Sequence, residues 1–382
     1  MALNVLSTDR LSTNVSTTNL NTSFGQLGSR SVIINGAMQV AQRATTSASI
    51  TTGGYYTVDR WYTTLATAGT WTQYQDADVP AGKGFGKSLS FDCTTADASL
   101  GAGDRAMLSY RLEGQDVQRF RKGTAGAKKF ALSFWVKSPK TGTHIVELYD
   151  HDNGRHICKA YTVSSANTWE QKELIIDNET SNAFGNDTGK SLEIQFYLAA
   201  GSNYTSGTLA TAWAANVNAN RAVGQVNCAD STSNKFFLTG VQLEAGDDCT
   251  EFEHRSYTAE YDRCCRYFWL IANGSESAAG SGGDGLAPIA TGNTYNSTQA
   301  FCVIPFPTRM RTQPSIYKVT GTSYWDIVQA DDHDACDDVT VNRVSTTAVS
   351  LYFNGNLSVN NTYPCHIRTY NALARLGVQA EL

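Results

Sequence analysis

Residues 130–138 read FALSFWVKS, and this run decides the class of fold that the chain can form. Apolar and aromatic side chains fill most of its positions and Pro139 ends it, a pattern typical of a buried β-strand. Other runs of this kind, bounded by turn residues, lie at 56–65, 87–93, 107–113, 144–149, 173–177, 192–198 and 236–244. Without interleaved helices, such strands bury their apolar faces only in a sandwich or barrel. We therefore expect an all-β fold with a jelly-roll-like β-sandwich over residues 31–255.

A second, smaller set of strands follows a predicted helix. Residues 256–268 combine Ser256, a good helix N-cap, with apolar and aromatic residues at helical spacing. A stretch rich in Gly and Ser completes a connector over residues 256–285. Further strand-like runs lie at 300–306, 314–320, 339–344, 348–353 and 366–376. They predict a C-terminal β-domain over residues 286–382.

The composition limits what the chain can bind. Its 382 residues allow two or three folded units, and only 17% of them are charged. The net charge of -5 provides no basic field for a phosphate backbone, so nucleic acid is not an expected partner. We also expect no membrane segment and no signal peptide, because no apolar run approaches the length of a bilayer and the start, MALNVLSTDR, lacks a basic region and a hydrophobic core.

The first 30 residues form a predicted arm. Its apolar side chains are separated by Ser, Thr and Asn and are too sparse for a core. We expect the arm to be disordered alone and to become ordered in grooves of a neighbouring subunit; a flexible leader without a partner is the alternative. The candidate attachment residues are Leu3, Val5, Leu6, Leu11, Val15, Leu20 and Phe24.

Two local patterns predict structure. The residues Asp152, Asn153, Gly154 and Arg155 lie between two strand-like runs and predict a tight type I′ hairpin. The nine cysteines are an odd number scattered over the chain, so we expect mostly reduced and buried thiols.

Two further patterns resemble functional motifs, but the residues around each of them favour a structural role. Residues 81–88, AGKGFGKS, match a permissive phosphate-loop pattern, but polar residues precede them and a strand-like run follows, which predicts a loop between strands. His144, His151 and His156 lie close together, but strand alternation and the intervening turn would point their rings in different directions. We expect a solvated hairpin there and no metal.

An acidic run beside two aromatic residues is the predicted glycan site. Residues 331–338 read DDHDACDD and must face water or a cation, but they lack the spacing of an EF-hand loop. Tyr324 and Trp325 lie next to this run, and aromatic faces stack on sugar rings. The candidate glycan-binding residues are Tyr324, Trp325, Asp331 and Asp332.

The sequence contains no Gly-x-Ser-x-Gly elbow and no His-Glu-x-x-His motif. Glu147, Glu173 and Glu193 fall on predicted strands, and whether any two converge across a cleft stays open. We expect no enzymatic activity, no cofactor and no catalytic residues.

Several stretches together resemble a group of bacteriophage tail-fibre proteins from phages of aquatic bacteria. They include INGAMQVAQR at 34–43, YTVDRWY at 56–62 and YRLEGQ at 110–115. The longest similarity runs through LAAGSNYTSG at 198–207 and NRAVGQV at 220–226, and the resemblance closes with TGVQLEAGDDCTEF at 239–252 and RCCRYF at 263–268. The resemblance is good over about residues 31–268. It is looser in the final domain, through FPTRMRTQP at 306–314 and the ending GVQAEL.

The resemblance implies a virion structural protein. The arm would fix the subunit to the particle, the sandwich would be a carbohydrate-binding-like module, and the oligomer would be a homotrimer that attaches to a host-surface glycan. The alternatives are a capsid fibre or decoration protein, a glycan depolymerase and a secreted lectin. Only the partner of residues 1–30 would distinguish tail from capsid attachment.

Overall fold

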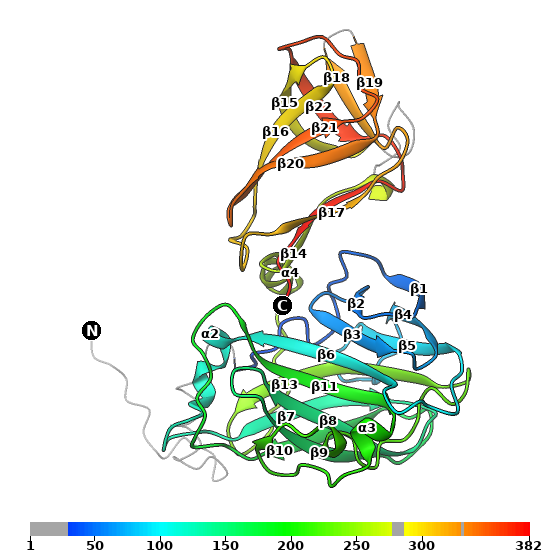
Figure 1. Ribbon diagram of the computed structural model, residues 1–382, viewed down its shortest axis with the longest axis vertical. Helices are drawn as coiled ribbons and strands as arrows, with labels where there is room; N and C mark the ends of the chain where they lie inside the picture. Colours follow the sequence, from blue (N-terminus) through cyan, green and yellow to red (C-terminus); the bar gives the residue numbers. More distant parts are fainter. Residues whose placement is uncertain (1–29, 277–285, 330–331) are drawn as a thin grey trace.

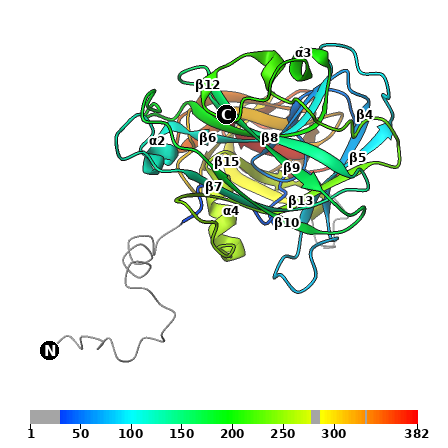
Figure 2. The same ribbon diagram turned by 90° about the horizontal axis from the view of Figure 1, so that it is seen from below.

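The computed structural model describes residues 30–276, 286–329 and 332–382, the side chains of Glu276 and Asp332 excepted. These residues form two β-rich parts, a large sandwich and a smaller set of C-terminal sheets above it (Figure 1). Seen from below, the sandwich lies in front of the C-terminal sheets (Figure 2). The all-β fold, with a jelly-roll-like sandwich before a smaller β-rich part, is confirmed.

The sandwich consists of two antiparallel sheets. The six-stranded sheet has the order β1 (Thr46–Ile50), β4 (Thr70–Asp76), β5 (Ser88–Thr95), β13 (Lys235–Ala245), β7 (Phe130–Lys137) and β10 (Glu170–Ile176). The seven-stranded sheet has the order β12 (Ala214–Ala215), β9 (Arg155–Val163), β8 (Gly142–Asp150), β11 (Lys190–Ala200), β6 (Arg105–Glu113), β3 (Trp61–Ala66) and β2 (Gly54–Tyr55). Short helices α2 (Gly114–Val117), η2 (Gln118–Phe120), α3 (Ser202–Thr205) and η3 (Asn218–Asn220) lie in the connections.

Side-chain alternation fills the space between the two sheets. In β3, Trp61, Thr63 and Leu65 are buried while the residues between them are partly exposed. Phe134 of the six-stranded sheet meets Phe196 of the seven-stranded sheet edge to face, with ring centroids 5.0 Å apart. Aromatic contacts of this kind join the two sheets into one core.

Two further sheets follow helix α4 (Tyr257–Cys265), which begins as predicted: the Ser256 hydroxyl accepts a hydrogen bond from the Ala259 amide at 3.3 Å. β14 (Phe268–Asn273), β23 (Arg375–Gln379) and β17 (Ser315–Val319) form a three-stranded sheet. The other sheet is a seven-stranded half-barrel of β19 (Asp332–Cys336), β18 (Trp325–Gln329), β22 (Pro364–Thr369), β15 (Pro288–Asn296), β16 (Gln299–Pro305), β21 (Ala348–Asn354) and β20 (Asp338–Val344). The predicted connector thus contains a strand, β14, before the short helix η4 (Gly274–Glu276).

The last residues of the chain join the C-terminal sheets to the sandwich. Glu381 forms ion pairs with Arg60 at 2.5 Å and with Arg43 at 3.4 Å. The Leu382 carbonyl oxygen accepts hydrogen bonds from Arg111 and, at 3.1 Å, from the Tyr55 hydroxyl. The Arg60 and Glu381 side chains are almost completely buried, so this ion pair at the junction is shielded from water.

Three local predictions can be compared with the structure. The nine cysteines are free thiols and all but Cys249 are buried, as expected. Residues 81–87 lie in the connection between β4 and β5, and Ser88 begins β5, so the phosphate-loop-like pattern is a loop between strands. The hairpin prediction was wrong in its turn type: β8 and β9 are joined by the four residues 151–154, and of these only Gly154 has a positive φ, of 60°.

Among the described residues, no helix is long and apolar enough to span a bilayer.

Candidate functional site

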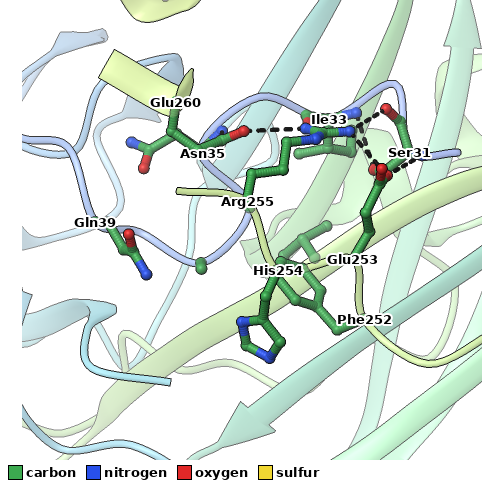
Figure 3. A pocket seen from close by; sticks show the side chains of 12 residues that line it. Ser31, Ile33, Asn35, Gln39, Phe252, Glu253, His254, Arg255 and Glu260 are labelled. Carbon is green, nitrogen blue, oxygen red and sulfur yellow. Dashed lines mark hydrogen bonds and ion pairs between the residues drawn. The ribbon is translucent and has the colours of Figure 1, made fainter. Parts of the chain in front are cut away.

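A small cavity of about 10 Å³ lies where residues 31–39 meet residues 252–260 (Figure 3). Arg255 fixes this contact by donating to the carbonyl oxygens of Ser31 at 2.8 Å and Ile33 at 3.0 Å. It also pairs with Glu253 at 3.0 Å and Glu260 at 3.1 Å. The space holds about one water molecule. These contacts therefore anchor the start of the described chain, and the cavity is too small for a ligand.

A larger groove, here called the sheet groove, lies on the outer face of the seven-stranded sheet of the sandwich. Its volume is about 360 Å³, which falls within the range of about 300–1,000 Å³ seen for small-molecule sites. Strands β3, β6, β8 and β11 provide most of its surface, and the segment after η3 adds an arginine. The sheet groove is lined by Tyr62, Thr64, Arg105, Met107, Arg111, Tyr149, His151, Glu193, Gln195 and Arg221.

Strand alternation brings these side chains to one face. In β11, Ile194 and Phe196 belong to the core, so the neighbouring Glu193 and Gln195 point outward. In the register of the sheet, Glu193 lies opposite Arg111 of β6 and opposite Tyr149 of β8. Residues more than 80 positions apart in the chain, Arg111 and Glu193, thus become direct neighbours.

Glu193 holds the centre of the sheet groove together. Its carboxylate accepts a hydrogen bond from Arg111 Nε at 3.0 Å and contacts His151 Nε2 at 2.8 Å. Lys190 lies 3.5 Å from the same carboxylate. Burial alone would raise the pKa of Glu193, but the hydrogen bond from His151 and the charges of Arg111 and Lys190 outweigh it and hold the pKa well below its usual range. The carboxylate is therefore ionised at neutral pH.

A second ionic cluster, built around the fully buried Glu147, adjoins the groove. Arg221 Nε contacts both oxygens of the Glu147 carboxylate at 3.0 Å, and its Nη2 donates to Gln195 at 2.7 Å. Glu147 also accepts from the Tyr197 hydroxyl at 3.0 Å and contacts His156 Nδ1 at 2.7 Å. Gln195 is thereby fixed in one orientation in the groove surface.

The same cluster corrects the expectation of a solvated hairpin. His144 and Glu147 of β8 and His156 of β9 are fully buried. The segment that follows α3 covers this hairpin; for example, the Cys158 amide donates to the Ala210 carbonyl at 2.7 Å. Glu147, His156 and Cys158 place possible ligand atoms within 4.8 Å of one another, as a metal site would. In this structure the Arg221 guanidinium supplies the positive charge to Glu147, so the geometry fits an ion pair.

Two partly exposed tyrosines give the groove its flat surfaces. The Arg111 guanidinium lies 3.7 Å from the centroid of the Tyr62 ring. The rings of Tyr149 and His151 lie 4.5 Å apart. Each tyrosine is thus held by a neighbouring planar group, which leaves less side-chain entropy to be lost when a ligand stacks on it.

The predicted glycan-binding residues do not form such a surface. Trp325 is fully buried and packs against Phe353 with ring centroids 5.7 Å apart, so its ring is part of the C-terminal core. Tyr324 is partly buried against the same core. Asp331 lies outside the described residues, as does the side chain of Asp332, the first residue of β19.

The rest of the acidic run is engaged within the protein. Asp337 accepts a hydrogen bond from the Ser323 amide at 2.7 Å, and Asp338 pairs with Lys318 at 2.5 Å. Asp334 accepts from the Ser358 amide at 2.5 Å.

The candidate attachment residues of the arm, between Leu3 and Phe24, lie outside the described residues.

The register of the sheet shows which of the glutamates Glu147, Glu173 and Glu193 lie close together. Glu147 faces Gln195 and Glu193 faces Tyr149, so the two glutamates lie on adjacent strands of one face. Glu173 lies on β10 of the other sheet. The groove arginines, Arg105, Arg111 and Arg221, were not predicted from the sequence. For Arg105 and Arg111 the available signal was their alternation with the apolar core residues of β6, whereas Arg221 lies outside the strands.

No known protein family matches the sequence, and no curated protein matches it. Solved structures show distant similarity. A domain of tailspike protein 4 of bacteriophage CBA120 is 15% identical, with a TM-score of 0.30, and the match covers 56% of this chain and 21% of the tailspike chain. A family 11 carbohydrate-binding module of Clostridium thermocellum is 14% identical, with a TM-score of 0.25, over 55% of this chain and all of the module. A putative sugar-binding protein of Bacteroides thetaiotaomicron is 12% identical, with a TM-score of 0.28, over 56% and 99% of the two chains. The chain thus has a distant structural similarity to carbohydrate-binding β-sandwiches and to a phage tailspike domain.

Proposed function

We propose that this chain is a non-enzymatic structural protein of a bacteriophage virion, of the tail-fibre type, and that its sheet groove binds a glycan of the host surface. The observation that carries the glycan part is the composition of the groove. Two partly exposed tyrosines lie beside arginine, glutamate and glutamine side chains that are fixed by one another.

This combination suits a sugar. A sugar ring has an apolar face that can stack on Tyr62 or Tyr149, and hydroxyl groups at its edge that need both donors and acceptors. Gln195 and Arg111 supply donors, and Glu193 supplies acceptors. Because hydrogen bonds and ion pairs already fix these groups, ordering them on binding would cost little entropy.

The absence of catalysis is part of the proposal. Glycoside hydrolysis requires one protonated carboxylic acid and one carboxylate on either side of the bond. Glu147 and Glu193 each pair with an arginine, and the pKa of Glu193 is lowered rather than raised. A depolymerase remains the alternative to test: incubation with host polysaccharide would then release reducing ends.

The virion assignment rests on the resemblance of residues 31–268 to phage tail fibres. We propose a homotrimer that is attached to other virion proteins through residues 1–30. A capsid fibre would share the same groove and differ only in the partner of that arm. Light scattering of the purified protein should give three times the chain mass of 41.4 kDa, and a cryo-EM map of the particle should place residues 1–30 against the tail. A monomer in solution, or an arm bound to the capsid, would contradict this part.

Binding to host-surface polysaccharide tests the groove. Replacing Tyr62 by Ala removes a stacking face and should weaken binding about tenfold, which corresponds to about 1.4 kcal/mol. The matched control is Tyr295→Ala, because Tyr295 is 62% exposed in the C-terminal part. Titration calorimetry of both variants, with circular dichroism to check folding, gives the comparison. Equal affinity of the wild type and a folded Tyr62→Ala variant would contradict glycan binding in this groove.

A further inference from the structure

We propose that the glycan bound in the sheet groove is anionic, with a carboxylate or sulfate group on the sugar, and that Arg105 binds this anion. The inference rests on the proposed function, because it assumes that the groove binds a glycan. It adds the chemical class of the ligand and the residue that selects it.

The charges around the groove are unequal. Arg105, Arg111 and Arg221 line it, and Lys190 lies next to it. In the part of the chain that the structure describes, two carboxylates pair with them: Glu193 with Arg111 and Lys190, and Glu147 with Arg221. The four positive charges therefore exceed the two negative ones by two, and a groove with this balance attracts an anion.

Arg105 is the arginine of the groove that lacks a counter-ion. Among the residues that the structure describes, no carboxylate forms an ion pair with it, and its buried Nε has no hydrogen-bond partner. Nearly all buried N–H groups in proteins are hydrogen-bonded, so the unpaired Nε shows that the protein itself compensates this guanidinium poorly. The planar guanidinium fork matches the oxygens of a carboxylate or sulfate.

The surroundings hold Arg105 in place. Its Nη1 donates to the Tyr204 hydroxyl, and its Cζ lies 5.1 Å from the centroid of the Tyr204 ring. Tyr204 is 6% exposed, and its backbone carbonyl accepts from the Ala222 amide at 2.8 Å. The Arg221 Cζ lies 6.0 Å from the same ring. Two guanidinium groups thus lie near one fixed tyrosine, and an anion at Arg105 would also be attracted by Arg221.

The first experiment uses the wild-type full chain and paired polymers. Binding to alginate and to polygalacturonate is compared with binding to the same polymers after carboxyl reduction, and binding to a sulfated galactan with binding to its desulfated form. We expect at least one anionic polymer to bind about tenfold or more tightly than its neutral partner. This preference should decrease between low and high salt. The pair that shows it identifies the anion as carboxylate or sulfate.

The second experiment assigns the preference to Arg105. Arg105→Gln should lose it, and Arg105→Lys should keep part of it because the charge remains without the fork. The control is Arg343→Gln, which changes an exposed arginine of β20. A folded Arg105→Gln variant with the full preference would overturn the role of Arg105. If Arg105→Gln does not fold, Arg105→Lys decides: a folded lysine variant with the full preference would overturn the role of Arg105.

The outcomes separate this inference from the proposed function. Equal binding to neutral and anionic polymers would overturn the anionic ligand and support glycan binding. Binding to no polymer of the panel and to no host polysaccharide would overturn both.

Discussion

Glu193 concentrates much of the chemistry of the sheet groove in one residue. Its two oxygens contact Arg111 and His151, and Lys190 lies nearby. A carboxylate with 4% of its side chain exposed would be costly without such partners. Its ionised state therefore supports both the fold and the shape of the groove.

This dependence predicts a response to acid. Glu193 has a folded-state pKa below its ordinary value of 4.5. Such a group stabilises the folded state above its unfolded pKa, and the stabilisation is lost as the pH falls through the lowered value. The wild type should therefore lose stability below a pH of about 4.5, and Glu193→Gln should lose less over the same interval.

Urea midpoints measured across this pH range give the comparison. Glu173→Gln serves as the control, because Glu173 is exposed on β10 of the other sheet. It should follow the wild type. Parallel curves for the wild type and Glu193→Gln would rule out a special role of Glu193.

At the scale of the strand, β13 contains an irregularity that depends on one glycine. Its register with β7 shifts between Thr239 and Gln242, and Gly240 has a φ of 60°. A Cβ atom at Gly240 would lie 2.6 Å from Phe85 Cζ and 3.0 Å from Trp135 Cδ1. The bulge therefore requires glycine for both its backbone and its close contacts.

Gly240→Ala should lower the free energy of unfolding by roughly 1–3 kcal/mol, because a left-handed backbone and a steric clash both disfavour alanine. Gly246→Ala is the matched control on the same chain segment, because no heavy atom lies within 4 Å of its added Cβ. Its effect should stay within about 0.5 kcal/mol. Chemical denaturation measures both. Similar values for the two variants would contradict the steric argument.

Strands with an apolar face could be predicted from the sequence, and polar strands could not. The predicted run at 130–138 matches β7, and the run at 236–244 matches β13, to within one residue at each end. β4, TWTQYQD, and β19, DHDAC, were missed because polar side chains dominate them. Their place as strands comes from pairing with neighbours, which a single sequence does not display.

The groove was beyond the sequence for a related reason. Glu147 and Glu193 could be placed on strands, but their proximity depends on the register between β8 and β11. Trp325 was chosen because it lies beside an acidic run, yet it packs in the core against Phe353. The predicted site thus relied on residues that are neighbours in the sequence, whereas the groove is formed by residues that are neighbours across strands.

At the scale of the whole molecule, the ion pair of Arg60 with Glu381 helps to join the sandwich to the C-terminal sheets. Arg60 is almost completely buried, pairs with Glu381 and lies 3.4 Å from the centroid of the Tyr267 ring. Its Nη2 also donates to the Arg111 carbonyl at 2.7 Å. The contact thus reaches the strand that carries a groove arginine.

Glu381→Gln leaves the buried Arg60 without a full counter-charge. We expect the free energy of unfolding to fall by about 3–5 kcal/mol, as for other broken buried pairs. The control is Asp247→Asn, which breaks an exposed pair with Lys129 and should change stability by less than about 1 kcal/mol. Thermal and chemical unfolding of the full chain measure the difference. Equal stability of the two variants would show that the junction contributes little.

The buried thiols have a practical consequence for following motion in this protein. Burial raises the pKa of Cys93 in the sandwich to about 11 and that of Cys302 in the half-barrel to about 12, so both remain protonated and shielded. An alkylating reagent can reach either sulfur only while the surrounding layer is open. Mass spectrometry of the alkylated peptides would therefore measure the opening rates of the sandwich and of the half-barrel separately, without any introduced probe.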